Sequence, residues 1–143
     1  MAAAAAEIAG VGLGLDDILA VSFLGPRAIR RVNRAFLGHD DVTDVISFDY
    51  RVEGSLPSPG EVAVELLICP DLALARSCEL RNVDYSRELT LYLVHGLLHA
   101  AGHDDLDPAP RRRMRIAERR VMRRLRRRFS LAEVFAPPRK VRP

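Results

Sequence analysis

The order of short apolar runs and helical stretches constrains the fold of this chain more than any other feature of its sequence. Residues 17–23, 45–48 and 61–69 are apolar and β-prone, and they predict three strands. Apolar residues at helical spacing predict helices from Pro26, over 70–80, over 88–101 and from Pro108 to about Phe129. This order predicts an α+β fold, a single compact domain in which a mixed, α/β-type sheet packs with helices.

Punctuating residues set the expected boundaries of these elements. Gly38 and Gly102 are expected to end two helices, while Ser86 and Asp107 are candidate N-caps. The glycines and prolines of 53–60 predict a turn or exposed loop. The Ala- and Gly-rich residues 1–14 predict a frayed helix or flexible start. We therefore expect one domain over 15–130, followed by a disordered basic tail over 131–143.

Composition excludes several classes of protein. None of the apolar runs in the 143 residues approaches the roughly 18 to 20 that a membrane span needs, and the start lacks the basic region of a secretory signal. Cys69 and Cys78 form no C-x-x-C pair, which excludes a disulfide scaffold and an all-cysteine zinc site. We interpret them as inert buried thiols. The sequence thus predicts a cytoplasmic protein that does not enter a membrane.

Charge is divided sharply along the chain. Residues 1–110 carry a net charge of −9 and residues 111–143 carry +12, and eleven of the eighteen residues over 111–128 are arginine. Met114, Val121 and Leu125 form the apolar stripe by which this last helix packs, so its arginines face outward. Arginine binds phosphate in a bidentate manner, which favours a nucleic-acid partner over a merely solvated face. An acidic protein surface or anionic lipid is the remaining alternative. The few aromatic residues favour contacts to the backbone and shape of a nucleic acid over base stacking.

Two histidines on one helix predict a metal site. His95 and His99 are four residues apart and therefore lie on the same helix face. On an unbroken helix His103 would lie about 12 Å from His95 along the axis, too far for one tight site. Gly102 permits a left-handed turn that folds the chain back, so that Asp105 or His103 becomes the third ligand. Two imidazoles and one carboxylate leave the fourth position of a tetrahedral Zn²⁺ open to water.

Gly96 argues against one common use of such a site. In H-E-x-x-H peptidases a glutamate directly follows the first histidine and acts as the base, and Gly96 stands there in this chain. The zincin-like metal-binding helix therefore lacks the usual peptidase base. A zincin-like peptidase remains an alternative, and the Arg-rich helix also counts against it.

These motifs together resemble the YbeY endoribonucleases, a family of ribosomal RNA maturation factors. Its signature H-G-x-L-H-x-x-G-x-D-H is matched, except at its last position, by His95-Gly96-Leu97-Leu98-His99-Ala100-Ala101-Gly102-His103-Asp104-Asp105. The family's second signature is matched by two stretches, Val32-Asn33 through Gly38 and Thr43-Asp44-Val45-Ile46-Ser47-Phe48. Gly60-Glu61-Val62, further along, resembles the family's G-[DE]-[IV]. Met114 and Glu118 stand where the family has M-x-x-x-E.

The resemblance implies a function and its partners. It implies a cytoplasmic, single-strand-specific, metal-dependent endoribonuclease that holds one Zn²⁺ per chain. It also implies action on ribosomal RNA, in maturation of the small-subunit 3′ end and in ribosome quality control, with small-subunit ribosomal proteins as candidate partners. The alternative is a non-catalytic ribosome-assembly factor with a structural metal.

Site residues are carried over from the family position by position. Asp105 stands where the family has its third metal-binding histidine, with His103 as a rival. Leu37 replaces an arginine thought to meet the phosphate, and Arg34, one turn earlier, is a candidate substitute. The expected catalytic residues are therefore His95, His99 and Arg34. The expected residues of the cleft and around the ligands are Thr43, Asp44, Ser47 and Asp104, the last of which could instead cap its turn. The expected RNA-binding residues are Arg27, Arg30, Arg31, Arg34, Arg111, Arg112, Arg115 and Arg119.

Overall fold

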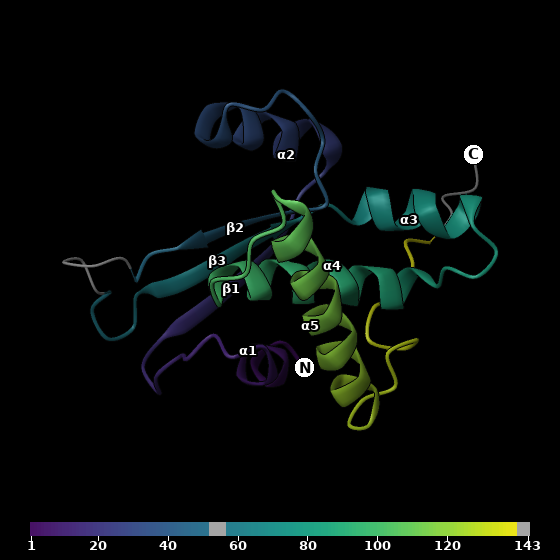
Figure 1. Ribbon diagram of the computed structural model, residues 1–143. Coiled ribbons are helices and arrows are strands. Elements are labelled where there is room, and N and C mark those ends of the chain that lie inside the picture. Colours follow the sequence, from purple (N-terminus) through teal and green to yellow (C-terminus); the bar gives the residue numbers. More distant parts are fainter. Residues whose placement is uncertain (52–56, 140–143) are drawn as a thin grey trace.

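The sheet is mixed, as the sequence predicts. The computed structural model describes residues 1–51 and 57–139 (Figure 1). Its strands are β1 (Ile18–Phe23), β2 (Val45–Asp49) and β3 (Val62–Ile68), arranged in the order β1-β3-β2. β3 pairs in parallel with β1 and antiparallel with β2. All three predicted strands are confirmed with small shifts at their ends. Part of the predicted turn over 53–60 lies outside the described residues, and Pro59 and Gly60 form a turn.

Helices cover both faces of this sheet. They are α1 (Ala2–Ala9), α2 (Pro26–Val32), α3 (Pro70–Glu79), α4 (Tyr85–Ala100) and α5 (Pro108–Arg126), with a short π-helix, η1 (Asn33–Leu37), directly after α2. Figure 1 shows α2 on one side of the strands and α1 on the other, with α5 packed against α4. Alternation along β3 explains the arrangement: Val64 and Leu66 enter the large core with α1, α4 and α5, whereas Leu67 packs with Ile29 of α2. The predicted α+β architecture is confirmed.

The start of α4 differs from the prediction. Asp84 is the N-cap, and its side chain accepts a hydrogen bond of 3.0 Å from the Arg87 amide. Ser86 lies inside the helix and is buried. Its hydroxyl donates to the Leu131 carbonyl over 2.6 Å and accepts from the Phe135 amide over 2.9 Å. The assignment of Ser86 as the N-cap is therefore wrong, because this hydroxyl holds the segment after α5.

Both ends of the described chain pack on the core. In α1 the side chains of Ala5, Ala6 and Ile8 are buried in the large core. After α5, Leu131 is 3% exposed and Phe135 makes an edge-to-face contact with Phe23 of β1. The residues that we expected to form a flexible start and a disordered tail thus include segments that contribute to the packing of the domain. Residues 140–143 lie outside the described residues.

Two smaller findings concern cysteines and membranes. Cys69 is buried, as expected, but Cys78 is exposed on α3, so the interpretation of both thiols as buried is wrong for Cys78. Within the described residues, the helices are too short or too polar to cross a membrane.

Candidate metal centre and adjoining cleft

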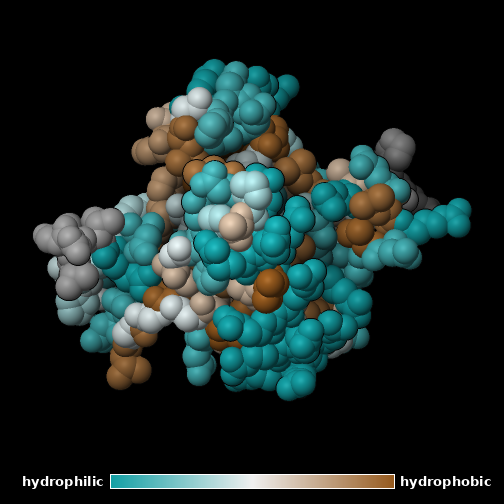
Figure 2. Space-filling view, viewed as in Figure 1, coloured by the Kyte–Doolittle hydropathy of each residue, from teal (hydrophilic) through white to brown (hydrophobic). Residues whose placement is uncertain are grey.

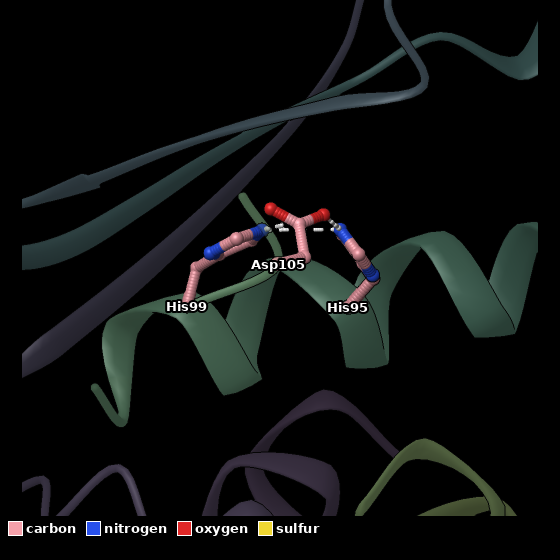
Figure 3. Close-up of side chains that lie close together, drawn as sticks. All are labelled: His95, His99 and Asp105. Atoms are coloured by element: carbon pink, nitrogen blue, oxygen red, sulfur yellow. Dashed lines mark hydrogen bonds and ion pairs between the residues drawn. The ribbon is translucent and has the colours of Figure 1, made fainter. Parts of the chain in front are cut away.

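Three side chains converge at the C-terminal half of α4. Figure 3 shows His95 and His99 rising from adjacent turns of the helix, with the Asp105 carboxylate between them. The two Nε2 atoms are 3.1 Å apart, and Asp105 Oδ2 lies 3.4 Å from the Nε2 of His95 and 3.8 Å from that of His99. One ligand atom from each residue lies within 4.8 Å of the other two. These residues form a group that could hold a metal ion.

A chain reversal after α4 brings Asp105 to the histidines. Gly102 adopts the left-handed conformation, with φ of +95°, and the His103 amide donates to the Leu98 carbonyl over 2.9 Å. The predicted turn is thereby confirmed. The His103 imidazole is not among the converging groups of the described residues. The structure therefore favours Asp105 over His103 as the third member of the group.

Hydrogen bonds at the other ring nitrogen fix the orientation of both imidazoles. A carboxylate and a carbonyl can only accept, so His95 Nδ1–H donates to Glu118 Oε1 over 2.5 Å and His99 Nδ1–H donates to the His103 carbonyl over 3.1 Å. In the neutral imidazoles each Nε2 is then an acceptor. Two such nitrogens and a carboxylate oxygen facing one point repel one another unless a cation or a proton lies between them. Partners of this kind are typical of metal-ligating histidines.

The surroundings of His95 favour positive charge. Burial disfavours the charged imidazolium, but the hydrogen bond and charge of Glu118 act in the opposite direction, with Asp44 and Asp105 adding to them. Together these carboxylates raise the pKa of His95 above its ordinary value. The negative charge that stabilises a proton here would also stabilise a metal cation.

Glu118 is the functional residue that sequence reasoning left without a role. It comes from α5, 23 residues after His95, and its side chain is only 17% exposed. The M-x-x-x-E resemblance singled it out, but local spacing cannot show which side chain it contacts.

The loop that carries Asp105 is held by backbone contacts. Arg111 donates from Nε to the Asp105 carbonyl over 3.0 Å and from Nη2 to the Leu106 carbonyl over 3.2 Å. Asp104 accepts from the Leu106 amide over 3.0 Å and so caps the turn, and it is not among the hydrogen-bond partners of His95 and His99 in the described residues. Arg111, which we expected to bind RNA, therefore already stabilises the ligand loop.

A cleft of about 650 Å³ opens beside His95. Thr43 and Asp44 line it, and Thr43 Oγ1 donates to Asp44 Oδ1 over 3.2 Å. Arg115 and Glu118 of α5 form part of the other wall. The structure thus brings two of the expected cleft residues and one of the expected RNA-binding arginines next to His95.

Other expected residues lie elsewhere. Ser47 donates to the Gly96 carbonyl over 2.9 Å and so ties β2 to α4, outside the cleft lining. Arg30 forms an ion pair with Asp40, with 2.9 Å between Nε and Oδ1. Arg34 is exposed on η1 and is not among the described residues that line the cleft, and Leu37 is 50% exposed. Arg27, Arg31, Arg112 and Arg119 are exposed as well.

Gly96 permits the close approach of α4 to the sheet. A Cβ atom on this buried residue would lie 2.8 Å from Val45 Cγ2 and 3.0 Å from Leu66 Cδ2. The glycine therefore sets the depth at which His95 and His99 sit beneath β2. A glutamate at this position would clash with the sheet, which gives a structural reason why the peptidase base is absent.

Comparison with known proteins identifies the family. A sequence model described as endoribonuclease YbeY matches residues 3–126. The chain belongs to the YbeY family. Relatives named endoribonuclease YbeY include one from Rhodopirellula baltica, 41% identical over 123 residues, and one from Chlorobium luteolum, 42% identical over 107 residues. These alignments cover 85% and 75% of this YbeY-family chain, but only 59% of the first relative and 72% of the second.

A solved structure agrees in fold. The solution structure of a Thermotoga maritima protein matches this YbeY-family chain with a TM-score of 0.52 and 24% identity, over 94% of this chain and 86% of that one. The resemblance inferred from the sequence motifs is confirmed as family membership by the sequence comparisons, and the α+β fold agrees with that of the Thermotoga protein.

Proposed function

We propose that this YbeY-family chain is a metal-dependent endoribonuclease that cleaves single-stranded RNA during ribosomal RNA maturation. The observation that carries the proposal is the convergence of His95, His99 and Asp105, with both Nδ1 atoms engaged so that both Nε2 atoms face one point. The relatives' name supplies the reaction class. Maturation of the small-subunit 3′ end, ribosome quality control, contacts with small-subunit proteins and a cytoplasmic location are the finer parts of this proposal.

The donor set fits one Zn²⁺ per chain. Two imidazole nitrogens and one carboxylate oxygen are typical of zinc sites that keep an open coordination position. When bound there, zinc would polarise a phosphate oxygen or lower the pKa of a water molecule toward neutrality. Because Asp105 replaces a neutral histidine, this site carries one more negative charge than the family pattern.

The surrounding residues would bind and orient the RNA. Arg115 lines the cleft beside His95, where its guanidinium can neutralise charge that develops on the phosphate. Thr43 and Asp44 offer a hydroxyl and a carboxylate in the same cleft for orienting water or a ribose hydroxyl. Arg34, which lies one turn before Leu37 and is exposed on η1, is the proposed substitute for the arginine that Leu37 replaces.

A non-catalytic assembly factor is the second candidate. Leu37, which takes the place of a phosphate-binding arginine, and the changed ligand Asp105 favour it. Both candidates predict RNA binding, and they differ only in whether the metal centre cleaves.

Metal content and RNA cleavage together test the proposal. We expect purified wild-type protein to bind about one zinc per chain by elemental analysis and to cleave a single-stranded RNA. His99→Ala and Asp105→Ala should lose both properties, whereas His103→Ala should keep them because the His103 imidazole lies outside the group. RNA binding without cleavage in any metal-loaded wild-type sample would favour the assembly factor, and casein turnover would favour the peptidase.

A further inference from the structure

A second groove continues from the metal-centre cleft between α4 and α5. It has a volume of about 420 Å³ and shares the lining residues Glu88, Leu91 and Glu118 with the cleft beside His95. The two hollows are therefore adjacent, and we call them together the channel. From the metal centre it runs toward the start of α4 at Asp84 and toward the last turns of α5. We call the part beyond Glu118 the α4–α5 groove.

One face of α5 presents arginines along this channel. Arg115 lines the cleft, and Arg119, Arg123 and Arg126 line the α4–α5 groove. Steps of four, four and three residues place them on a single helix face. At about 1.5 Å per residue the row extends for roughly 16 Å. Arg76 lines the cleft, and Arg87 lines the groove.

Four carboxylates line the channel, and each has a partner within the protein; Asp44 accepts from the Thr43 hydroxyl over 3.2 Å. Glu88, 12% exposed, pairs with Arg76 at 2.8 Å, and Glu118 accepts from His95. Asp84 caps the first turn of α4. By contrast, among the described residues no ion pair involves the four arginines of the α5 row. Six arginines against four carboxylates give the channel a formal excess of two positive charges for an external polyanion, and Figure 2 shows a broad hydrophilic surface over α5.

We propose that the α4–α5 groove binds the phosphate backbone of single-stranded RNA on one side of the scissile bond. This inference rests on the proposed function and specifies the path of its substrate. A row of about 16 Å is long enough to contact several successive phosphates of an RNA strand. Guanidinium groups bind phosphates in a bidentate manner without reading the base, which suits a track that tolerates many sequences.

The shape of the surface favours RNA over other polyanions. A membrane would need a convex or flat basic face, whereas these arginines line a groove. The groove adjoins the cleft that His95 lines, as the path of a substrate chain requires. An acidic protein segment is the competing occupant that an experiment must distinguish.

Two triple variants, each of which removes three positive charges, test whether the α4–α5 groove binds RNA. The groove variant carries Arg119→Gln, Arg123→Gln and Arg126→Gln. The control carries Arg113→Gln, Arg120→Gln and Arg124→Gln, three arginines that are exposed on another face of α5 and do not line the channel. Fluorescence anisotropy would measure binding of single-stranded RNA of two to twelve nucleotides at several salt concentrations, with circular dichroism and metal content as checks of folding.

The groove variant should lose affinity for the longer RNAs but not for the dinucleotide. Its slope of log affinity against log salt should fall by about 2, since roughly 0.7 is lost for each phosphate contact. The control should keep the wild-type slope. Equal losses of RNA affinity in both variants would overturn the proposed RNA binding by the α4–α5 groove and assign the effect to net charge. The proposed function would stay intact. Stronger competition by polyglutamate than by RNA would overturn RNA binding by the groove in favour of an acidic protein. Absence of RNA binding by the wild type would instead refute the proposed function.

Discussion

The contact between Glu118 and His95 allows a direct test of how the ligand histidines are held. The bond of 2.5 Å links a carboxylate that is 17% exposed to the Nδ1 of an imidazole whose Nε2 faces His99 and Asp105. Loss of such an outer partner typically lowers metal affinity by about 10 to 100-fold, which corresponds to about 1.4 to 2.7 kcal/mol. We expect Glu118→Gln near the lower end and Glu118→Ala near the upper end.

The order of the two variants follows from what each retains. Gln keeps the size of the side chain and an oxygen that can accept from Nδ1–H, so it removes the charge but preserves the orientation of the ring. Ala removes the acceptor as well, so that His95 can rotate or adopt the other tautomer. Both variants should bind zinc more weakly while their metal-free forms keep the wild-type circular dichroism spectrum.

Competition with a chelator of known affinity measures the zinc dissociation constants. Glu79→Gln, which removes a charge from an exposed side chain at the end of α3, is the matched control and should bind zinc like the wild type. Wild-type zinc affinity in a folded Glu118→Ala protein would refute the argument that this carboxylate fixes the ligand. An effect of Gln equal to that of Ala would show that charge, and not ring orientation, accounts for the loss.

Three further predictions concern the fold around the site. Gly96→Ala should lower the free energy of unfolding by about 1 to 3 kcal/mol through overpacking against the sheet, while Gly25→Ala, whose Cβ would meet no atom within 4 Å, should change it far less in urea titrations. Asp84→Ala should cost about 1 kcal/mol in the same assay because α4 loses its N-cap. The hydrogen bond from Arg51 lowers the pKa of Asp49 below its ordinary 3.8. The stability that this pair contributes is therefore present above about pH 4 and is lost as the pH falls through the lowered pKa, so the difference in melting temperature between wild type and Asp49→Asn should shrink as the pH is lowered below about 4.

Much of the architecture follows from local patterns, and the exceptions have identifiable causes. The strands were predictable because short β-prone runs stand between turn residues. The N-cap of α4 was not, because Asp84 and Ser86 are both good capping residues and a hydrogen bond to Leu131, 45 residues away, decides between them. The sequence allowed a frayed helix over the first residues, but not the packing of α1, because its small alanines carry little periodic signal and are buried only because α4 and α5 pack beside them.

The same distinction between local and distant contacts applies to the candidate site. Helical spacing placed His95 and His99 on one face, and Gly102 predicted the reversal after them. The choice between Asp105 and His103 stayed open because it depends on which atom of His103 turns inward. In the structure the His103 carbonyl accepts a hydrogen bond from His99. This bond directs the chain so that the Asp105 carboxylate reaches the two imidazoles.

The division of charge between the body and the last helix acquires a spatial meaning in the fold. α5 packs through Met114, Val121 and Leu125 into the same core as α4, so the most basic segment lies against the helix that carries the histidines. Its one carboxylate turns inward to His95, while the row that begins at Arg115 faces the channel. One helix thus stabilises a cation on one side and favours a polyanion on the adjoining side. Among the described residues Glu118 forms no ion pair with an arginine, so both charge preferences are present within a few turns of helix.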